Sequence, residues 1–222
     1  MSRPLDPDQR RAFMVAGQIA DRGVSDARVL QAMRSVPRDL FVPEPLRERA
    51  HDDQALPIAE GQTISQPYIV ALTCEGLRLS GGEKVLEIGT GSGYAAAVLA
   101  RLAGEVWTVE RIDRLAAAAA ELLARLGLTN VHVRCADGTL GWPEQAPFDA
   151  IAVAAGGPSV PRPLKTQLKV GGRLVIPVGA ERSRQRLLRV VRVSEREWTT
   201  ETLAEVAFVP LVGEEGWAPD AF

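Results

Sequence analysis

The chain has 222 residues, 46% of them hydrophobic and 24% charged, and 26 basic against 28 acidic residues give a net charge of −2. This length suits one domain. The nearly neutral net charge gives no excess of basic residues that would indicate binding to nucleic acid or to an anionic membrane. No stretch has the roughly 20 apolar residues of a membrane span, and the polar N-terminus lacks the apolar core of a signal peptide. Cys74 and Cys135 lie far apart without metal-ligand spacing. We therefore expect a cytoplasmic protein without a metal site.

The first third of the sequence predicts helices followed by a long irregular segment. One helix is expected over residues 8–20, ended near Gly23, and a second over residues 26–35 with Ser25 as its N-cap. Residues 42–67 are rich in Pro, Gly and polar side chains and show little periodicity. So long an irregular stretch inside a compact domain is usually functional.

From residue 80 onward, short apolar strands alternate with helices. Strands are expected at 84–88, 105–110, 131–134, 148–154 and 173–177, and helices at 94–102, 115–126 and 163–169, with Gly171 and Gly172 as the turn into the last strand. This alternation indicates a parallel sheet covered on both faces. The run 150–155 is entirely apolar, as expected of a central strand that is buried on both sides.

After Gly179 the pattern changes to strand-like segments at 187–193, 198–203 and 206–209, which have short connections and are therefore expected to pair antiparallel. The predicted fold class is α/β, an open, doubly wound, mostly parallel sheet with a helical N-terminal cap and an antiparallel C-terminal edge. We expect a single domain over residues 1–222. Its parts are the helical cap and substrate-side loop (1–79), the cofactor-binding core (80–180) and the antiparallel strands (181–222).

A glycine-rich turn, Glu87-Ile-Gly-Thr-Gly-Ser-Gly93, lies between the first strand of the core and its helix. Cofactors bind at this edge of open α/β sheets, although three glycines could also serve only a tight turn. A dinucleotide fingerprint requires a third glycine where Tyr94 stands, and no Gly-Lys-Ser/Thr of a phosphate-binding loop follows. The remaining pattern, an acid followed by Gly-x-Gly-x-Gly, is typical of an S-adenosylmethionine site.

The charges of this cofactor's amino acid end explain the pattern. We expect Glu87 to attract the ammonium, directly or through water, and backbone amides of the turn to meet the carboxylate. The residues of the turn assigned to the cofactor are Glu87, Gly89, Gly91, Ser92 and Gly93.

The next two strands end on further candidate ligands. Glu110 closes the second strand, where a carboxylate can accept hydrogen bonds from both ribose hydroxyls. Asp137, followed by Gly138, comes after the third strand and could accept a hydrogen bond from the adenine amino group. A solvated acid at a strand end and a plain Asp-Gly turn are the alternatives, and the position of these residues beside the glycine turn favours a cofactor site.

Four sequence blocks resemble the protein-L-isoaspartate O-methyltransferase family across nearly the whole chain. They lie at 14–43, at 55–67, at 85–94 and at 136–151. The glycine turn is shared by many methyltransferases, whereas Gln-Thr-Ile-Ser-Gln-Pro at 62–67 and Asp-Gly…Gly-Trp…Ala-Pro-Phe-Asp at 137–149 are more particular to this family. Two positions depart from it: Ala154 stands where a threonine is expected, and His51 where a tyrosine is common.

The resemblance implies methyl transfer from S-adenosylmethionine to the free α-carboxylate of L-isoaspartyl residues in damaged proteins and peptides. The ester then closes to a succinimide, whose hydrolysis returns part of the material to normal aspartate. The resemblance also assigns roles by position: Ser65 matches the active-site serine, and Gln62, Thr63 and Ile64 match the segment that lines substrate and cofactor. It places Glu110 at the ribose and Asp137 with Gly138 at the adenine.

The sequence offers no convincing catalytic base, and the reaction needs none, because a carboxylate with a pKa near 4 is already ionised at neutral pH. Ser65 is expected to hold one carboxylate oxygen while the other attacks, although its hydroxyl could instead cap the helix that begins near Pro67. The rival interpretations are a methyltransferase for another carboxylate, a non-catalytic protein that binds the cofactor, and, more remotely, a dehydrogenase. We expect a monomer.

Overall fold

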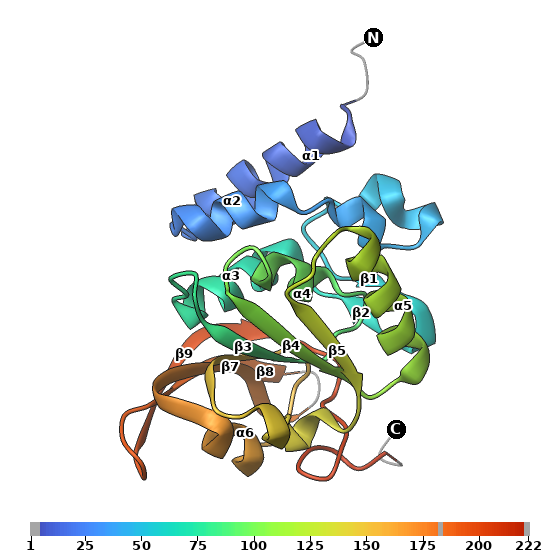
Figure 1. Ribbon diagram of the computed structural model, residues 1–222. Coiled ribbons are helices and arrows are strands. Elements are labelled where there is room, and N and C mark those ends of the chain that lie inside the picture. Colours follow the sequence, from blue (N-terminus) through green and yellow to red (C-terminus); the bar gives the residue numbers. More distant parts are fainter. Residues whose placement is uncertain (1–4, 182–183, 220–222) are drawn as a thin grey trace.

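The structure is a computed structural model, and it describes residues 5–181 and 184–219. Its main sheet has the strand order β5-β4-β3-β6-β7-β8-β9 (Figure 1). The strands are β3 (Lys84–Ile88), β4 (Glu105–Glu110), β5 (Val131–Cys135), β6 (Phe148–Val153), β7 (Leu168–Glu181), β8 (Arg184–Arg192) and β9 (Trp198–Val206). The first five strands in this order pair in parallel, and β8 and β9 continue the sheet antiparallel. The predicted open, mostly parallel sheet with an antiparallel edge is confirmed.

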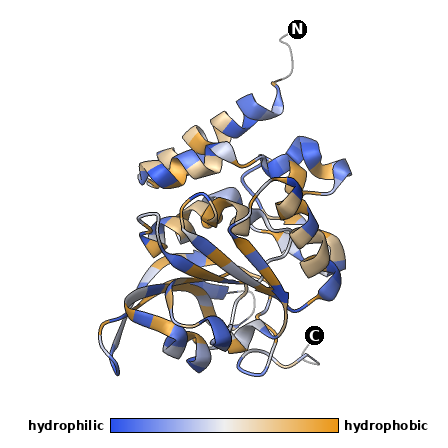
Figure 2. Cartoon of the chain, in the orientation of Figure 1, coloured by the Kyte–Doolittle hydropathy of each residue, from blue (hydrophilic) through white to orange (hydrophobic). Residues whose placement is uncertain are grey.

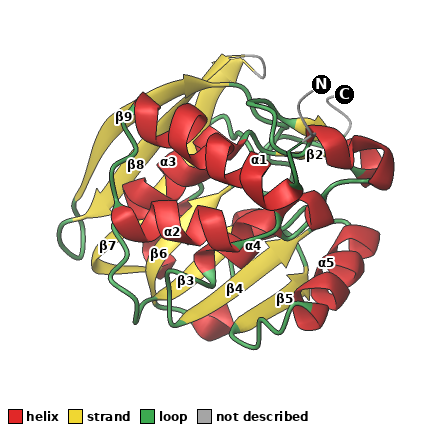
Figure 3. Ribbon diagram, turned by 90° about the horizontal axis from the view of Figure 1, so that it is seen from above, coloured by secondary structure: helices red, strands yellow, loops and turns green. Residues whose placement is uncertain are grey.

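Helices cover both faces of the sheet (Figures 1 and 3). They are α1 (Pro7–Phe13), α2 (Ala27–Ser35), α3 (Pro67–Leu77), α4 (Tyr94–Leu99), α5 (Asp113–Arg125) and α6 (Arg162–Gln167). The chain after α1 stays helical as a π-helix over Met14–Ile19 and a 3₁₀ turn over Ala20–Arg22, which Gly23 ends in the left-handed region. The π-helical segment and α2 pack on α3 and α4. The helical cap therefore forms a second layer outside the helices that contact the sheet.

Two hydrophobic cores hold these layers together. The larger core joins the cap, α3, α4 and one face of the sheet, and the smaller one lies on the opposite face, where Leu164 of α6 is fully buried. Ala150 and Ile151 of β6 point into different cores, which confirms that this strand is central and buried on both faces. Hydrophobic residues run along the central strands, whereas the outer end of α1 is hydrophilic (Figure 2).

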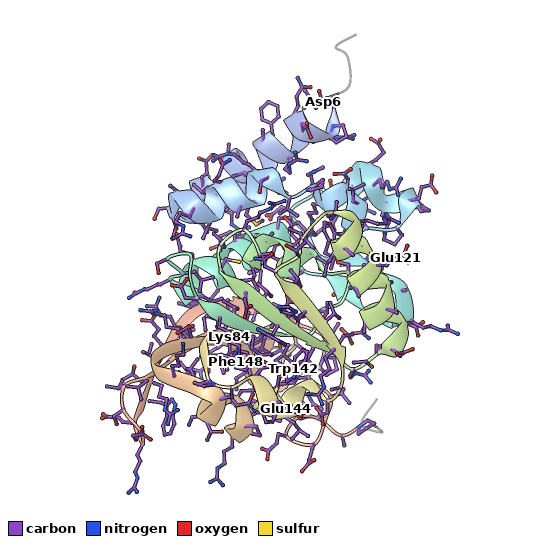
Figure 4. All side chains as sticks on the ribbon, in the orientation of Figure 1. Asp6, Lys84, Glu121, Trp142, Glu144 and Phe148 are labelled. Carbon is purple, nitrogen blue, oxygen red and sulfur yellow. The ribbon has the colours of Figure 1, made fainter. Side chains whose placement is uncertain are left out.

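Aromatic side chains cover the sheet on the side of α6, below β3, β4 and β5. The ring of Trp107 stacks on His132 with centroids 4.1 Å apart and meets Trp142 edge-on at 5.0 Å. The Lys84 ammonium lies 5.1 Å from the Trp107 ring, and Figure 4 shows Lys84, Phe148 and Trp142 together on this side. His132 therefore has a packing role.

Three local predictions are wrong. Asp26, and not Ser25, is the N-cap of α2, because its carboxylate accepts hydrogen bonds from the first-turn amides. The predicted strand at 206–209 does not form beyond Val206, because the side chain of Gln185 binds both the amide and the carbonyl of Phe208 and turns the chain away from the sheet. The two glycines at 171–172 lie within β7, where the register with β6 shifts, instead of preceding the strand.

The irregular segment before α3 holds a small antiparallel pair, β1 (Leu56–Pro57) and β2 (Thr63–Ile64), joined by a 3₁₀ turn over Ala59–Gly61. Short 3₁₀ turns also occupy Arg38–Phe41 and Glu44–Arg49. Within residues 5–181 and 184–219, no helix has the length and apolar content to cross a membrane, and no three His, Cys, Asp or Glu side chains are grouped to hold a metal ion.

Candidate functional site

The carboxyl edge of the parallel strands opens into a cleft of about 750 Å³, including the solvent at its mouth. Its walls come from four parts of the chain: the β2 segment, the glycine turn, the ends of β4 to β6 and a segment near the C-terminus. The lining residues are 62–65, Val70, 88–92, Tyr94, Ala95, 109–111, Gly138, Ala154, Ala155 and 209–212. The sequence blocks that predicted a site therefore meet in one cavity.

The glycine turn between β3 and α4 is held by its own backbone. The amide of Gly89 donates to the carbonyl of Val109, and that of Gly93 donates to the carbonyl of Thr90. Gly91 has φ +53°, a left-handed conformation that L side chains rarely adopt, and its Cα faces Ile58 across the cleft mouth. Gly89, Gly91 and Ser92 line the cleft, but Gly93 does not, because its Cα faces Ala119 and Leu123 of α5.

Glu110 lies at the end of β4 and links the glycine turn to the next loop. One carboxylate oxygen accepts a hydrogen bond of 2.9 Å from the amide of Gly91, and the other accepts one of 3.0 Å from the amide of Ile112. The side chain is held between these two donors with 6% exposure, and it lines the cleft. Each oxygen keeps a further lone pair, so this carboxylate can accept hydrogen bonds from two neighbouring hydroxyls of a ligand.

Glu87 is buried beneath the turn with 1% exposure. One of its oxygens accepts a hydrogen bond of 2.6 Å from the hydroxyl of Thr108, which lies 2.6 Å from the hydroxyl of Thr90. The other oxygen has no hydrogen-bond partner among the described residues. Burial raises the pKa of Glu87 to about 8, and the Thr108 hydrogen bond opposes that rise. A buried carboxyl with a free oxygen suits a cationic ligand group, and the role predicted for Glu87 stays a prediction.

Behind the cleft lies an inner chamber of about 380 Å³, which shares Ser65, Val70, Ala95 and Ala154 with the cleft walls. Glu87 lines this chamber and not the cleft itself. Apart from Glu87 and the hydroxyl-bearing Ser65 and Thr73, the chamber has mainly apolar walls. Glu87 therefore lies in the wall of the chamber, and its predicted contact with the cofactor stays a prediction.

Ser65 stands where three cavities meet. It lines the cleft, the inner chamber and an outer groove that also includes Gln66, Ile69 and the end of β9. The alternative role for its hydroxyl, capping α3, does not occur, because Gln66 is the N-cap residue of that helix and no side-chain cap bond forms. Gln62, Thr63 and Ile64 continue this wall, and Thr63 also faces the outer groove.

Asp137 and Gly138 differ in their relation to the cleft. Gly138 lines it, and a Cβ at that position would lie 2.5 Å from Ile88 Cγ2, so the glycine allows close packing against β3. The carboxylate of Asp137 is not among the lining groups and accepts hydrogen bonds from Thr139 and from the amide of Glu214. Its predicted contact with an adenine amino group stays a prediction.

Residues 209–212, for which no role is predicted from the sequence, form one wall of the cleft. These residues follow β9 and return to the end of β6, where the amide of Gly156 donates to the carbonyl of Val209. The only sequence signal for this segment is Phe-Val-Pro-Leu at 208–211, a further pattern that resembles the family. No periodicity or charge pattern connects this tail with the glycine turn more than a hundred residues earlier.

Arg38 connects the cap to the Ser65 segment from a fully buried position. Its Nε donates to the carbonyl of Ala50 at 2.7 Å, one Nη donates to the carbonyl of Ser65 at 2.8 Å, and the guanidinium lies 4.6 Å from the ring centre of Tyr94. Burial lowers the pKa of the guanidinium, but arginine stays charged in proteins.

Replacement of Arg38 by alanine is expected to lower the free energy of unfolding by about 2 kcal/mol, because two buried carbonyls lose their donors. Urea denaturation followed by circular dichroism measures this difference. Arg47→Ala, at an exposed position of the same cap, is the matched control and should change the free energy of unfolding by less than about 0.5 kcal/mol. Equal stabilities of the two variants would contradict the linking role.

The sheet order and the cleft at its carboxyl edge define the class of protein, a Rossmann-like S-adenosylmethionine-dependent methyltransferase. The family model for protein-L-isoaspartate(D-aspartate) O-methyltransferase matches residues 9–216. This chain belongs to that family.

Individual relatives agree with this assignment. Protein-L-isoaspartate O-methyltransferase 1 of Rhodopseudomonas palustris is 63% identical over 94% of this chain and 85% of its own length. Protein-L-isoaspartate O-methyltransferase 2 of Marinobacter nauticus is 63% identical over 95% of each chain. A solved protein-L-isoaspartate O-methyltransferase has a TM-score of 0.82 at 32% identity, over 94% of this chain and 67% of that chain. A Plasmodium falciparum protein, solved with S-adenosyl-L-homocysteine, shares the fold with a TM-score of 0.77 at 24% identity, over 91% of this chain and 98% of that chain.

Proposed function

We propose that this enzyme transfers the methyl group of S-adenosylmethionine to the α-carboxylate of L-isoaspartyl residues, and that Ser65 holds the acceptor. The observation that carries the assignment of Ser65 is its position at the junction of the cleft, the inner chamber and the outer groove. A donor in the cleft and a peptide in the groove can meet at Ser65 and at Thr63, which lines both cavities too, and of these two only Ser65 also lines the inner chamber. Methylation starts the repair of such damage, because the ester can close to a succinimide.

The residues at the junction suit this chemistry. An acceptor carboxylate is ionised at neutral pH, so the enzyme must align it and exclude water, without removing a proton. The hydroxyl of Ser65 makes no hydrogen bond to any described residue and can donate to one acceptor oxygen while the other attacks. Val70 and Ala95, which line both the cleft and the chamber, keep the junction apolar. His51 and His132 line neither cavity.

The residues around the cleft fit the donor. S-adenosylmethionine supplies an activated methyl group on a sulfonium. We assign the ribose hydroxyls to Glu110, the amino acid end to Glu87 and to the turn formed by Gly89, Gly91, Ser92 and Gly93, and the nucleoside side to Gly138 and Asp137. Gln62, Thr63 and Ile64 form the wall between donor and acceptor. The orphaned oxygen of Glu87 and the fixed carboxylate of Glu110 are the observations that favour this arrangement.

Donor binding is expected to release a proton from Glu87. The pKa of this carboxyl is about 8 in the free protein, so at pH 7 it is protonated, and an ammonium beside it lowers that pKa. The complex thus binds fewer protons than the free protein, and affinity should rise with pH up to about 8 and then level off. Calorimetric titration with S-adenosylhomocysteine at pH 7, in two buffers of different ionisation enthalpy, measures the released proton.

Glu87→Gln should abolish the difference between the two buffers, whereas Glu121→Gln, an exposed acid on α5, should leave it intact. Identical heats in both buffers for the unmodified enzyme would contradict the proposed role of Glu87.

The substrate assignment is tested with paired peptides that differ only in an isoaspartyl or an aspartyl linkage. The isoaspartyl linkage moves the main chain by one methylene, so the aspartyl peptide should have a kcat/KM lower by about 100-fold. Equal rates on both peptides would favour a methyltransferase for other carboxylates, and no product with either would favour a protein that only binds the cofactor. A single domain, a monomeric state and a cytoplasmic location complete the proposal.

A further inference from the structure

Thr108 lies within β4, where it is fully buried and pairs in register with Glu87 of β3. Register partners on neighbouring strands project to the same face of a sheet, so the Thr108 hydroxyl lies beside the Glu87 carboxyl. Val106, two residues earlier on the same face, belongs to the larger hydrophobic core. A valine would fill the place of Thr108 equally well, and burial of a hydroxyl is unfavourable unless it forms hydrogen bonds. The hydroxyl of Thr108 therefore has a polar role.

The hydroxyls of Thr90 and Thr108 and the carboxyl of Glu87 form a chain of hydrogen bonds. The Thr108 hydroxyl donates to one Glu87 oxygen at 2.6 Å, and the oxygens of the two hydroxyls are also 2.6 Å apart. A hydroxyl has only one proton, so when Thr108 donates to Glu87 it must accept from Thr90. Thr90 lines the cleft and Glu87 lines the inner chamber, so the chain runs from one cavity to the other.

We infer that Thr108 is a positioning residue for donor binding: together with Thr90 it holds one oxygen of Glu87 and leaves the other free for the ammonium of the donor. The free oxygen is the one that has no hydrogen-bond partner among the described residues. Burial raises the pKa of Glu87, and the hydrogen bond from Thr108 opposes that rise, so the chain favours the ionised carboxylate. The inference rests on the proposed role of Glu87 and adds a residue that lines neither cavity.

Two other titratable groups act on the surroundings of Glu87. Glu110 of β4 adds to the rise that burial causes in the pKa of Glu87. Cys74 of α3 lines the chamber, and burial raises the pKa of its thiol, so the thiol stays neutral. The helix α4 and the strand β6 contribute apolar side chains to the chamber, and the hydroxyl of Tyr94 on α4 contacts Met33 in the cap. Both groups are the same in all variants at position 108.

The test measures the binding of S-adenosylhomocysteine by calorimetry at pH 7 and at pH 9. Thr108→Val keeps the shape of the side chain and removes its hydroxyl, which should raise the pKa of Glu87 and lower its ionised fraction at pH 7. The variant should therefore bind about 10-fold more weakly than the unmodified enzyme at pH 7, but only about twofold more weakly at pH 9. The ionisation of the ligand is the same for both proteins and cancels in this ratio. Thr108→Ser, which restores the hydroxyl, should follow the unmodified enzyme at both pH values.

Two further measurements show whether Thr108 acts through Glu87. In a Glu87→Gln background, Thr108→Val should change the affinity by less than about twofold at either pH, because the titrating group is gone. In the ligand-free protein, the infrared band of the protonated carboxyl that disappears in Glu87→Gln should titrate near pH 8, and at higher pH in Thr108→Val. Thr200→Val, at an exposed position of β9, is the control and should leave affinity and titration as they are.

Thr90→Val removes only the far hydroxyl of the chain and should shift the titration in the same direction by a smaller amount, so it supplies the test if Thr108→Val does not fold. Equal weakening by Thr108→Val at both pH values, or an unchanged titration of Glu87, would overturn the inference and leave the proposed function in place. If the unmodified enzyme did not bind S-adenosylhomocysteine at either pH, the proposed function would fail, and the inference with it.

Discussion

Glu110→Ala is expected to weaken the binding of S-adenosylhomocysteine by about 100-fold. The carboxylate accepts hydrogen bonds from the amides of Gly91 and Ile112 and lines the cleft, so its removal releases the glycine turn and also removes the proposed acceptor for ribose hydroxyls. Hydrogen bonds to a charged group contribute about 1.5–3 kcal/mol each, so even the loss of two accounts for this factor. Calorimetric titration at one fixed pH for all variants measures the dissociation constant.

The matched control is Glu105→Ala at the other end of the same strand, where the side chain is exposed and lies far from the cleft walls. Its dissociation constant should stay within about twofold of the unmodified enzyme. The dissociation constant of Glu110→Gln should lie between those of Glu105→Ala and Glu110→Ala, because the amide keeps one acceptor oxygen and loses the charge. A Glu110→Ala variant that binds the ligand as tightly as the Glu105→Ala variant would refute the assignment of Glu110.

Ser65→Ala is expected to lower kcat on an isoaspartyl peptide by about 100-fold, a loss typical of a misplaced reactant. Its hydroxyl is the polar group shared by the cleft, the chamber and the groove, and without it the acceptor carboxylate can rotate away from the methyl group. Affinity for S-adenosylhomocysteine should stay within about twofold, because the proposed role of Ser65 is to orient the acceptor and not the donor.

Ser80→Ala tests whether loss of any serine hydroxyl has this effect, since the Ser80 hydroxyl binds Glu83 in a turn outside the cleft. This control should turn over peptide at the normal rate. The assignment of Ser65 would be refuted by normal turnover in Ser65→Ala, or by a loss of turnover that a matching loss of donor affinity explains.

The sequence predicted the sheet and the place of the site because both follow from short-range patterns. Strand and helix segments alternate in the core, and the carboxyl ends of parallel strands meet at one edge, so Glu87, Glu110 and Asp137 at successive strand ends had to be neighbours. The same pattern predicted that Gly89 and Gly91 belong to the site. The segment that contains Ser65 shows little periodicity, so only the family resemblance indicated its role.

What the sequence did not predict depends on tertiary contacts. Glu87 lies beneath the turn and not in the cleft, since the strand end directs its side chain toward Thr108. The C-terminal segment 209–217 could not be placed from the sequence, because its contacts with Gly156 and Asp137 join residues between 53 and 77 positions apart. The break after Val206 likewise depends on the side chain of Gln185, which lies in the neighbouring strand β8 and binds Phe208, 23 positions later in the sequence.

The most direct test of the central claim is to locate the methyl group that the enzyme transfers. An isoaspartyl peptide incubated with the enzyme and an isotopically labelled donor should gain one methyl ester, which fragmentation by mass spectrometry should place on the α-carboxyl of the isoaspartyl residue. The label should then leave as the ester closes to a succinimide. Label on a nitrogen, on another carboxyl group, or equally on the aspartyl peptide would contradict the account.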